Sequence, residues 1–235
     1  MIYYATAAIA VISYLLGSIN TSIILSKSIY GEDIRKSGSG NAGATNMLRT
    51  HGKGIAVATL ICDVLKGTIA VVLGMWFDII FASNANTITE AHFLVDNLKY
   101  IAAIFVVLGH DFPIFFGFKG GKGVATSLGV IMMLNWKIGL IVLFAAIAIM
   151  AVSRYVSLGS ISAAALYPFI LFIYITAAGK KLEEYTAYII MSLILALMLI
   201  LKHHTNIRKL INGNENKLFA KKETAAELSG EENEI

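Results

Sequence analysis

The sequence has little of what a soluble enzyme normally carries. Only 14% of its 235 residues are charged, against about 25% in soluble proteins. Its single cysteine, Cys62, lies inside an apolar run, which excludes a disulfide framework, a cysteine zinc site and a redox pair. What is present instead is apolar: 57% of the residues are hydrophobic and the mean hydropathy is +0.73. This composition favours lipid as the solvent.

The basic residues are distributed in a way that argues against a nucleic-acid partner. The formal net charge is +4, but the lysines and arginines cluster between apolar runs and form no continuous stripe. We therefore interpret them as a sign of membrane topology. The first apolar segment has no basic stretch ahead of it, as a cleavable signal peptide would have, so we expect it to be the first membrane span.

Seven apolar runs are candidate spans, since about 20 helical residues cross a bilayer core of about 30 Å. They lie near 3–25, 54–77, 99–110, 123–134, 138–152, 159–178 and 185–201. The fourth and fifth are separated only by Asn135, Trp136 and Lys137. One helix over 123–152 would be about 45 Å long, too long for an untilted crossing, whereas two helices would each be short. Length alone leaves both arrangements open.

The loops indicate the orientation, because short cytoplasmic loops carry the excess of Lys and Arg. Loop 26–53 holds five such residues and loop 78–98 holds none. We therefore predict an all-α integral membrane protein with about seven transmembrane helices, an outside N-terminus and a cytoplasmic C-terminus. Asn84 and Lys180 should lie outside, although Lys137, Lys180 and Lys181 are basic residues on that side. Residues 1–217 should form the membrane domain, and 218–235 a polar, disordered tail.

Three polar, glycine-rich segments stand out, and this topology puts all of them on the cytoplasmic side. The first is SGSGNAGATNMLR, residues 37–49. Its small residues and amides allow backbone N–H groups to approach an anion, and Arg49 adds a planar donor fork suited to phosphate. A flexible loop with a helix cap explains this segment equally well.

The second segment is GHDFPIFFGFKGGKGVAT, residues 109–126. Lys119 and Lys122 flank a Gly-Gly pair just before an apolar helix, an arrangement typical of anion sites. The segment is not a P-loop, because Gly123 stands where Ser or Thr is required. We therefore predict no nucleotide. A tight loop whose lysines only mark the inner face remains an alternative.

The third segment is HHTNIRKLINGNE, residues 203–215, in which His203 and Asn206 would share a helix face. A lone His at a helix end is more often an interfacial anchor than a catalyst. Inside the second span, Asp63 and Lys66 are also three residues apart. Ionisable groups at membrane depth are candidate functional residues, but a structural ion pair explains them equally well.

In type, order and membrane side, the three segments together resemble the acyl-phosphate-dependent glycerol-3-phosphate acyltransferases, the PlsY family. The similarity extends to about Glu215 and departs at Lys209, where the family usually has Arg. It implies a seven-helix fold, glycerol 3-phosphate as acceptor, fatty acyl phosphate as donor, and no cofactor or metal. It also implies a bacterial cytoplasmic (inner) membrane with the active site on the cytoplasmic side. Membrane lipid and a soluble enzyme that makes acyl phosphate are the implied partners.

The resemblance also assigns site residues. The catalytic set is Ser39, Arg49, Lys119, Lys122, His203 and Asn206. The substrate-binding set is Gly40, Asn41, Gly43, Thr45, Asn46, His110, Gly120, Gly121, Gly123 and Ser157. Because an acyl phosphate is already activated, positioning and charge balance are sufficient and no acyl-enzyme is required. The family suggests that the donor phosphate takes the attacking proton, with His203 as the alternative base.

Three other classes compete with this interpretation. The large glycerophosphate acyltransferase class with a His-x4-Asp pattern is disfavoured, because none of the five His residues has Asp five positions on. A lipid phosphatase or phosphotransferase would usually need a nucleophilic His or an acidic metal cluster, and Asp63 has no nearby carboxylate. A transporter of anionic metabolites would suit Asp63 and Lys66 but needs access from both sides of the membrane.

Overall fold

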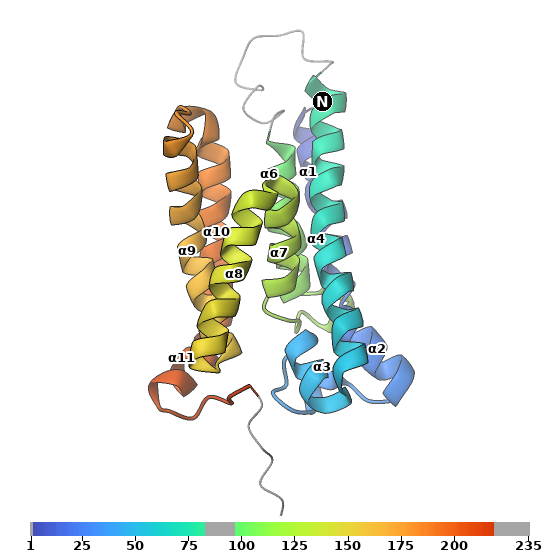
Figure 1. The fold of residues 1–235 in the computed structure, drawn as a ribbon. Coiled ribbons are helices and arrows are strands. Elements are labelled where there is room, and N and C mark those ends of the chain that lie inside the picture. Colours follow the sequence, from blue (N-terminus) through green and yellow to red (C-terminus); the bar gives the residue numbers. More distant parts are fainter. Residues whose placement is uncertain (1, 83–96, 219–235) are drawn as a thin grey trace, which may run out of the picture.

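The computed structural model describes residues 2–82 and 97–218, and in these ranges the chain forms helices and no strand (Figure 1). The α-helices are α1 Ile2–Ser18, α2 Thr21–Tyr30, α3 Ala44–His51, α4 Lys53–Ala82, α6 Leu98–Asp111, α7 Val124–Leu134, α8 Trp136–Ser153, α9 Val156–Ala177, α10 Thr186–Lys202 and α11 His204–Ile211. Short 3-10 turns are η1 Ile34–Lys36, η2 Ile114–Phe116 and η3 Leu182–Tyr185. The all-α membrane fold is confirmed. The predictions for Asn84 and for the tail beyond 218 lie outside the described residues.

Six helical segments of the described chain are long and apolar enough to cross a membrane, and α7 is a shorter seventh. With 11 residues, α7 spans about 16 Å, roughly half of the bilayer core. A continuous helix over 123–152 is not formed. The Asn135 side chain accepts the N–H groups of Lys137 (3.1 Å) and Ile138 (3.3 Å), which caps α8, and Gly139 of α8 lies against Met132 of α7.

The first apolar run differs from the expected single helix over 3–25, because it breaks after Ser18. Asn20 caps a new helix, α2, by accepting the Ile23 N–H at 3.2 Å. The break frees the carbonyl of Ile19, which accepts a hydrogen bond from Lys66 Nζ of α4 at 3.2 Å. A break in this apolar sequence is therefore stabilised by a cation from another helix.

The helices pack in two groups, α1, α4, α6 and α7 in one and α8, α9 and α10 in the other. Glycines bring α7 against α4. A Cβ at Gly67 would lie 2.2 Å from the Thr126 carbonyl oxygen, and one at Gly129 would lie 2.0 Å from that of Val64. Only a residue without a side chain fits at either position, as is common where membrane helices approach closely. The short helix α7 is thus held in the bundle by backbone contact.

The polar segments gather at one end of the bundle (Figure 1). Helices α2, α3 and α11 and the loop between α6 and α7 lie at the end opposite the start of α1. The turn between α9 and α10, which carries Lys180, lies at the other end. The structure therefore brings the three segments together, and which end faces the cytoplasm remains a prediction.

The Lys and Arg asymmetry predicts how each end reacts with a membrane-impermeant maleimide. In a Cys62→Ala background, we expect Lys180→Cys to be labelled in intact cells. Lys36→Cys, exposed at the opposite end, should be labelled only after the membrane is opened. Equal labelling of both variants in intact cells would contradict the topology.

Candidate active site

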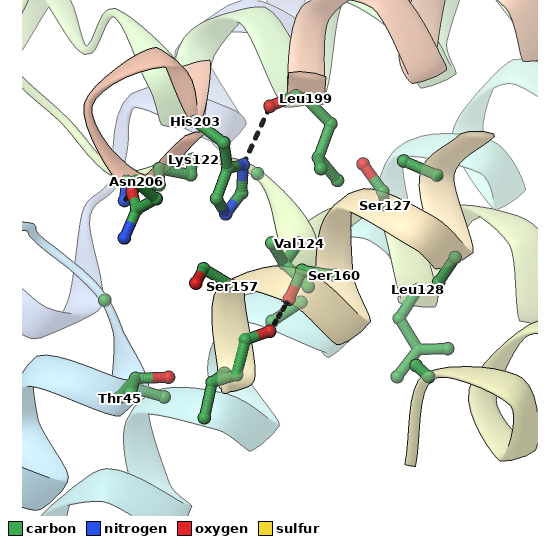
Figure 2. Close-up of a pocket in the computed structure, with 18 of the residues that line it drawn as sticks. Thr45, Lys122, Val124, Ser127, Leu128, Ser157, Ser160, Leu199, His203 and Asn206 are labelled. Atoms are coloured by element: carbon green, nitrogen blue, oxygen red, sulfur yellow. Dashed lines mark hydrogen bonds between the residues drawn. The ribbon is translucent and has the colours of Figure 1, made fainter. Parts of the chain in front are cut away.

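A cavity of about 370 Å³ opens between the two helix groups at the polar end (Figure 2). Its walls come from the first polar segment and from helices α3, α4 and α7 on one side. Helices α8, α9, α10 and α11 supply the other side. The cavity is polar where the three segments meet and apolar farther into the bundle.

Most of the residues expected from the sequence line this cavity. Of the proposed catalytic set, Ser39, Arg49, Lys122, His203 and Asn206 do so, together with Asn41, Gly43, Thr45, Asn46, His110, Gly123 and Ser157 of the substrate-binding set. Lys119, Gly40, Gly120 and Gly121 are not part of the wall. The structure thus gathers residues from all three segments and separates Lys119 from Lys122.

Four helix N-termini, those of α3, α7, α9 and α11, open onto the cavity through their first residues. In the described chain none of the four has a side-chain cap, whereas α2 and α8 are capped by Asn20 and Asn135. Uncapped helix starts present free N–H groups and the positive end of the helix dipole. Their convergence makes the polar half of the cavity a candidate anion site.

Asn46 holds the first segment in shape. Its Oδ1 accepts the Ser39 N–H at 2.8 Å, and its Nδ2 donates to the carbonyls of Ile34 (3.1 Å) and Ser37 (3.0 Å). The side chain is buried, and these bonds use most of what an amide can form. Asn46 therefore positions Ser39 at the cavity, and little of its amide is left for a substrate.

Two residues, Gly121 and Arg35, fix the position of the second segment next to the first. A Cβ at Gly121 would lie 2.1 Å from His110 Nε2 and 2.6 Å from the Ala42 carbonyl oxygen, so the two loops touch only because Gly121 has no side chain. Arg35 Nη1 donates to the carbonyls of Phe116 (2.7 Å) and Lys119 (2.9 Å). These contacts leave the Lys119 side chain exposed outside the cavity, while Lys122 reaches inside.

Lys122 begins a chain of polar contacts to the third segment. Its Nζ donates to Asn206 Oδ1, and Asn206 Nδ2 donates to Glu215 Oε1 at 2.9 Å. Burial lowers the pKa of Lys122 to about 8, and the Glu215 carboxylate opposes this shift. Sequence reasoning missed Glu215 and also Arg35. The position of Glu215 at the end of the third segment was the available signal.

His203 presents one defined nitrogen to the cavity (Figure 2). Its Nδ1 lies 2.8 Å from the Leu199 carbonyl oxygen, which can only accept, so Nδ1 carries the proton and Nε2 keeps a free lone pair. Burial lowers the pKa of His203 to about 4, so the ring is neutral near pH 7. Nearby, the Ser157 hydroxyl has no partner among the described residues. Both groups can hold a substrate hydroxyl.

The Asp63 and Lys66 pair forms part of a larger buried cluster. Lys66 Nζ lies 2.8 Å from Asp63 Oδ1 and 2.8 Å from His110 Nδ1, and all three residues are at most 5% exposed. Asp63 and His110 border the cavity, whereas Lys66 does not. Because Lys66 also binds the free carbonyl of Ile19 between α1 and α2, its contacts favour the structural explanation that the sequence left open.

The fold and the site together define a class of protein: a helical membrane enzyme whose cavity can hold a phosphate group at one end and a lipid chain at the other. Residues 7–213 match the protein family described as "Glycerol-3-phosphate acyltransferase". A relative of that name from Clostridioides difficile (strain 630) is 43% identical, covering 92% of this chain and 96% of its own. Another from Nostoc sp. (strain PCC 7120) is 40% identical, with 94% and 96% covered.

A solved structure agrees with these sequence relatives. It is the crystal structure of PlsY (YgiH), described as an integral membrane glycerol 3-phosphate acyltransferase in its glycerol 3-phosphate form. The TM-score is 0.73 with 32% identity, over 90% of this chain and 94% of that one. The chain belongs to the glycerol-3-phosphate acyltransferase family of the PlsY type, and the resemblance noted from the three segments is confirmed.

The lowered pKa of Lys122 predicts an alkaline limit on the acyltransferase activity of this family. Above about pH 8 the amine loses its charge, so kcat/KM for glycerol 3-phosphate should fall tenfold per pH unit. In Lys122→Arg this limb should move above pH 10, because a guanidinium stays charged. The position of the limb in pH-rate profiles is the readout, and the same limb in the Arg variant would show that Lys122 is not its source.

Proposed function

We propose that this protein transfers a fatty acyl group from acyl phosphate to the primary hydroxyl of glycerol 3-phosphate. The products are lysophosphatidic acid and inorganic phosphate, and the reaction serves phospholipid biosynthesis at the cytoplasmic face of a bacterial cytoplasmic membrane. The observation that carries the proposal is a single cavity with an anion site at one end and apolar walls at the other. A reaction that joins a water-soluble phosphate to a lipid chain needs both.

The anion end has enough positive charge for substrate phosphates. Arg49, Lys122 and Lys209 all line it, in addition to the four helix N-termini. Lys209 was left out of the expected site because Lys lacks the bidentate fork of Arg, yet it lies in the same wall. Two phosphate groups would meet here, one from each substrate, and opposite charge at this density offsets their mutual repulsion.

The apolar end is connected to the lipid. Leu60 of α4 and Ile147 of α8 both line the cavity and are 43% and 49% exposed on the bundle surface. A side chain that is part of both the cavity wall and the membrane-facing surface marks an opening between them. Acyl phosphate dissolved in the membrane can enter there with its phosphate directed to the helix N-termini.

The similar PlsY structures support the proposed acceptor and the proposed product. One is described as the glycerol 3-phosphate form and another as the lysophosphatidic acid form, the latter with a TM-score of 0.72 and 31% identity to this chain. Those molecules are the acceptor and the product of the proposed reaction. An acyl phosphate suits this cavity as donor because it is already activated and carries a phosphate that the anion end can hold.

The proposed step is direct transfer. The acceptor hydroxyl oxygen attacks the acyl carbonyl carbon, the bond from that carbon to the phosphate oxygen breaks, and the proton moves to the departing phosphate. Ser157 and Nε2 of His203 hold the hydroxyl, while helix N–H groups stabilise the negative oxygen of the intermediate. With a pKa near 4, His203 is a weak base, which favours positioning over proton removal. Cys62 is exposed on α4 and outside the cavity.

Arg49→Lys tests whether the guanidinium grips phosphate. The charge is kept but a parallel pair of bonds is lost, which costs about 1.5–3 kcal/mol and lowers kcat/KM about ten- to a hundredfold. Steady-state kinetics with glycerol 3-phosphate measure this. Lys36→Met, an exposed cation just before the first segment, is the matched control and should stay near wild type. Normal kinetics in a folded Arg49→Lys variant would reduce Arg49 to a topology signal.

The donor is tested with purified protein, palmitoyl phosphate and labelled glycerol 3-phosphate, compared with palmitoyl-CoA. We expect labelled lysophosphatidic acid from the acyl phosphate and none above background from the thioester. A faster reaction with palmitoyl-CoA would overturn the proposed donor.

The same preparation, incubated with acyl phosphate but no acceptor, should show no acyl adduct by intact mass. A stoichiometric adduct that is discharged by glycerol 3-phosphate would instead establish a covalent route.

A further inference from the structure

The apolar end of the cavity extends into the bundle between four helices. We define the acyl arm as the part of the cavity lined by Ile131, Val142, Ala146, Ala164, Tyr167 and Leu195. These residues come from α7, α8, α9 and α10, and each is at most 9% exposed. The arm therefore leaves the membrane-facing opening and runs into the protein core.

Tyr167 closes the arm. Among the cavity residues of α9 it lies farthest from the polar end, eleven positions beyond Val156 and hence about 16 Å along the helix. Its side chain is 1% exposed. One turn farther, Leu171 is fully buried in the same core and belongs to no part of the cavity wall.

Small side chains on α9 and α10 leave the arm open between the polar end and Tyr167. Helix α9 presents Ser160, Ala163 and Ala164 to the cavity, and α10 presents Ala196. These side chains are too small to fill the space between the helices. Tyr167 is the first large side chain that α9 places there, so the length of the arm follows from the order of residues on one helix face.

We propose that Tyr167 determines the longest acyl chain that the enzyme transfers efficiently, a specificity that rests on the proposed acyl-phosphate reaction. A chain that ends at the ring fills the arm. A longer chain must displace packed core residues or bend back toward the opening, and close-packed interiors resist such displacement. Each further methylene group that finds an apolar site contributes about fourfold to binding, so removing the ring should favour longer donors.

The test is the acyl-chain profile of purified wild type, Tyr167→Ala and Tyr167→Phe. We would measure kcat/KM with saturated donors from dodecanoyl to eicosanoyl phosphate at saturating glycerol 3-phosphate. In Tyr167→Ala, the ratio of the eicosanoyl to the myristoyl value should rise about tenfold or more, as the gain per methylene implies. Tyr167→Phe keeps the ring and should keep the wild-type ratio.

Two further variants separate specificity from loss of packing. Ala164→Leu narrows the arm before its end and should lower the same ratio about tenfold. This variant keeps the proposal testable if Tyr167→Ala does not fold. Val71→Ala truncates a buried side chain of the same core that does not line the cavity and should lower stability without changing the ratio.

Two results would overturn the proposal. One is a Tyr167→Ala enzyme that loses activity equally with every donor, or an Ala164→Leu enzyme with the wild-type ratio, which would show that the chain does not follow the arm. The other is a wild-type enzyme inactive with every acyl phosphate, which would remove the proposed function itself. The wild-type assay alone decides the second, so the two failures are distinguishable.

Discussion

Free N–H groups at helix starts are the constraint around which the site is built. Such groups need a partner, and in a membrane water is not available to every one of them. At α2 and α8 an asparagine side chain supplies the partner, and at α6 the Asp78 carboxylate accepts the Leu98 N–H. Where α3, α7, α9 and α11 meet, no side chain in the described residues does so. A phosphate bound there would accept these N–H groups, so that substrate binding and backbone satisfaction would be one interaction.

A buried cluster of polar side chains deeper in the bundle helps to hold these helix starts together. Lys66 contacts Asp63 of its own helix, His110 of α6 and the open carbonyl of Ile19, and so connects three helices at one ammonium group. His110 in turn packs under Gly121, which fixes the loop that carries Lys122. Loss of one partner would leave the others charged or polar in an apolar region, and this makes the cluster costly to disturb.

The sequence predicted the helical membrane class, most of the long apolar helices and the gathering of three segments, because these follow from hydropathy and motif order. It did not predict the break at Ser18, since the residues around it are apolar and the stabilising contact comes from Lys66, far along the chain. It also treated Lys119 and Lys122 as equivalent. They differ because Arg35 binds backbone carbonyls of the loop that carries them, which leaves Lys119 outside the cavity and Lys122 inside. A contact between residues so far apart in the chain cannot be recognised from the local sequence.

The shortness of α7 connects the two halves of the cavity. A helix that crossed the full bilayer would start near the surface, but α7 has 11 residues and starts beside Lys122, at the wall that also borders the apolar arm. Its glycine contact with α4 keeps it in the bundle despite its length. The positive end of a helix is thereby placed next to the membrane-facing opening between Leu60 and Ile147. A phosphate and an acyl chain attached to it could then occupy the two parts of one cavity, the phosphate near the helix start and the chain among apolar side chains.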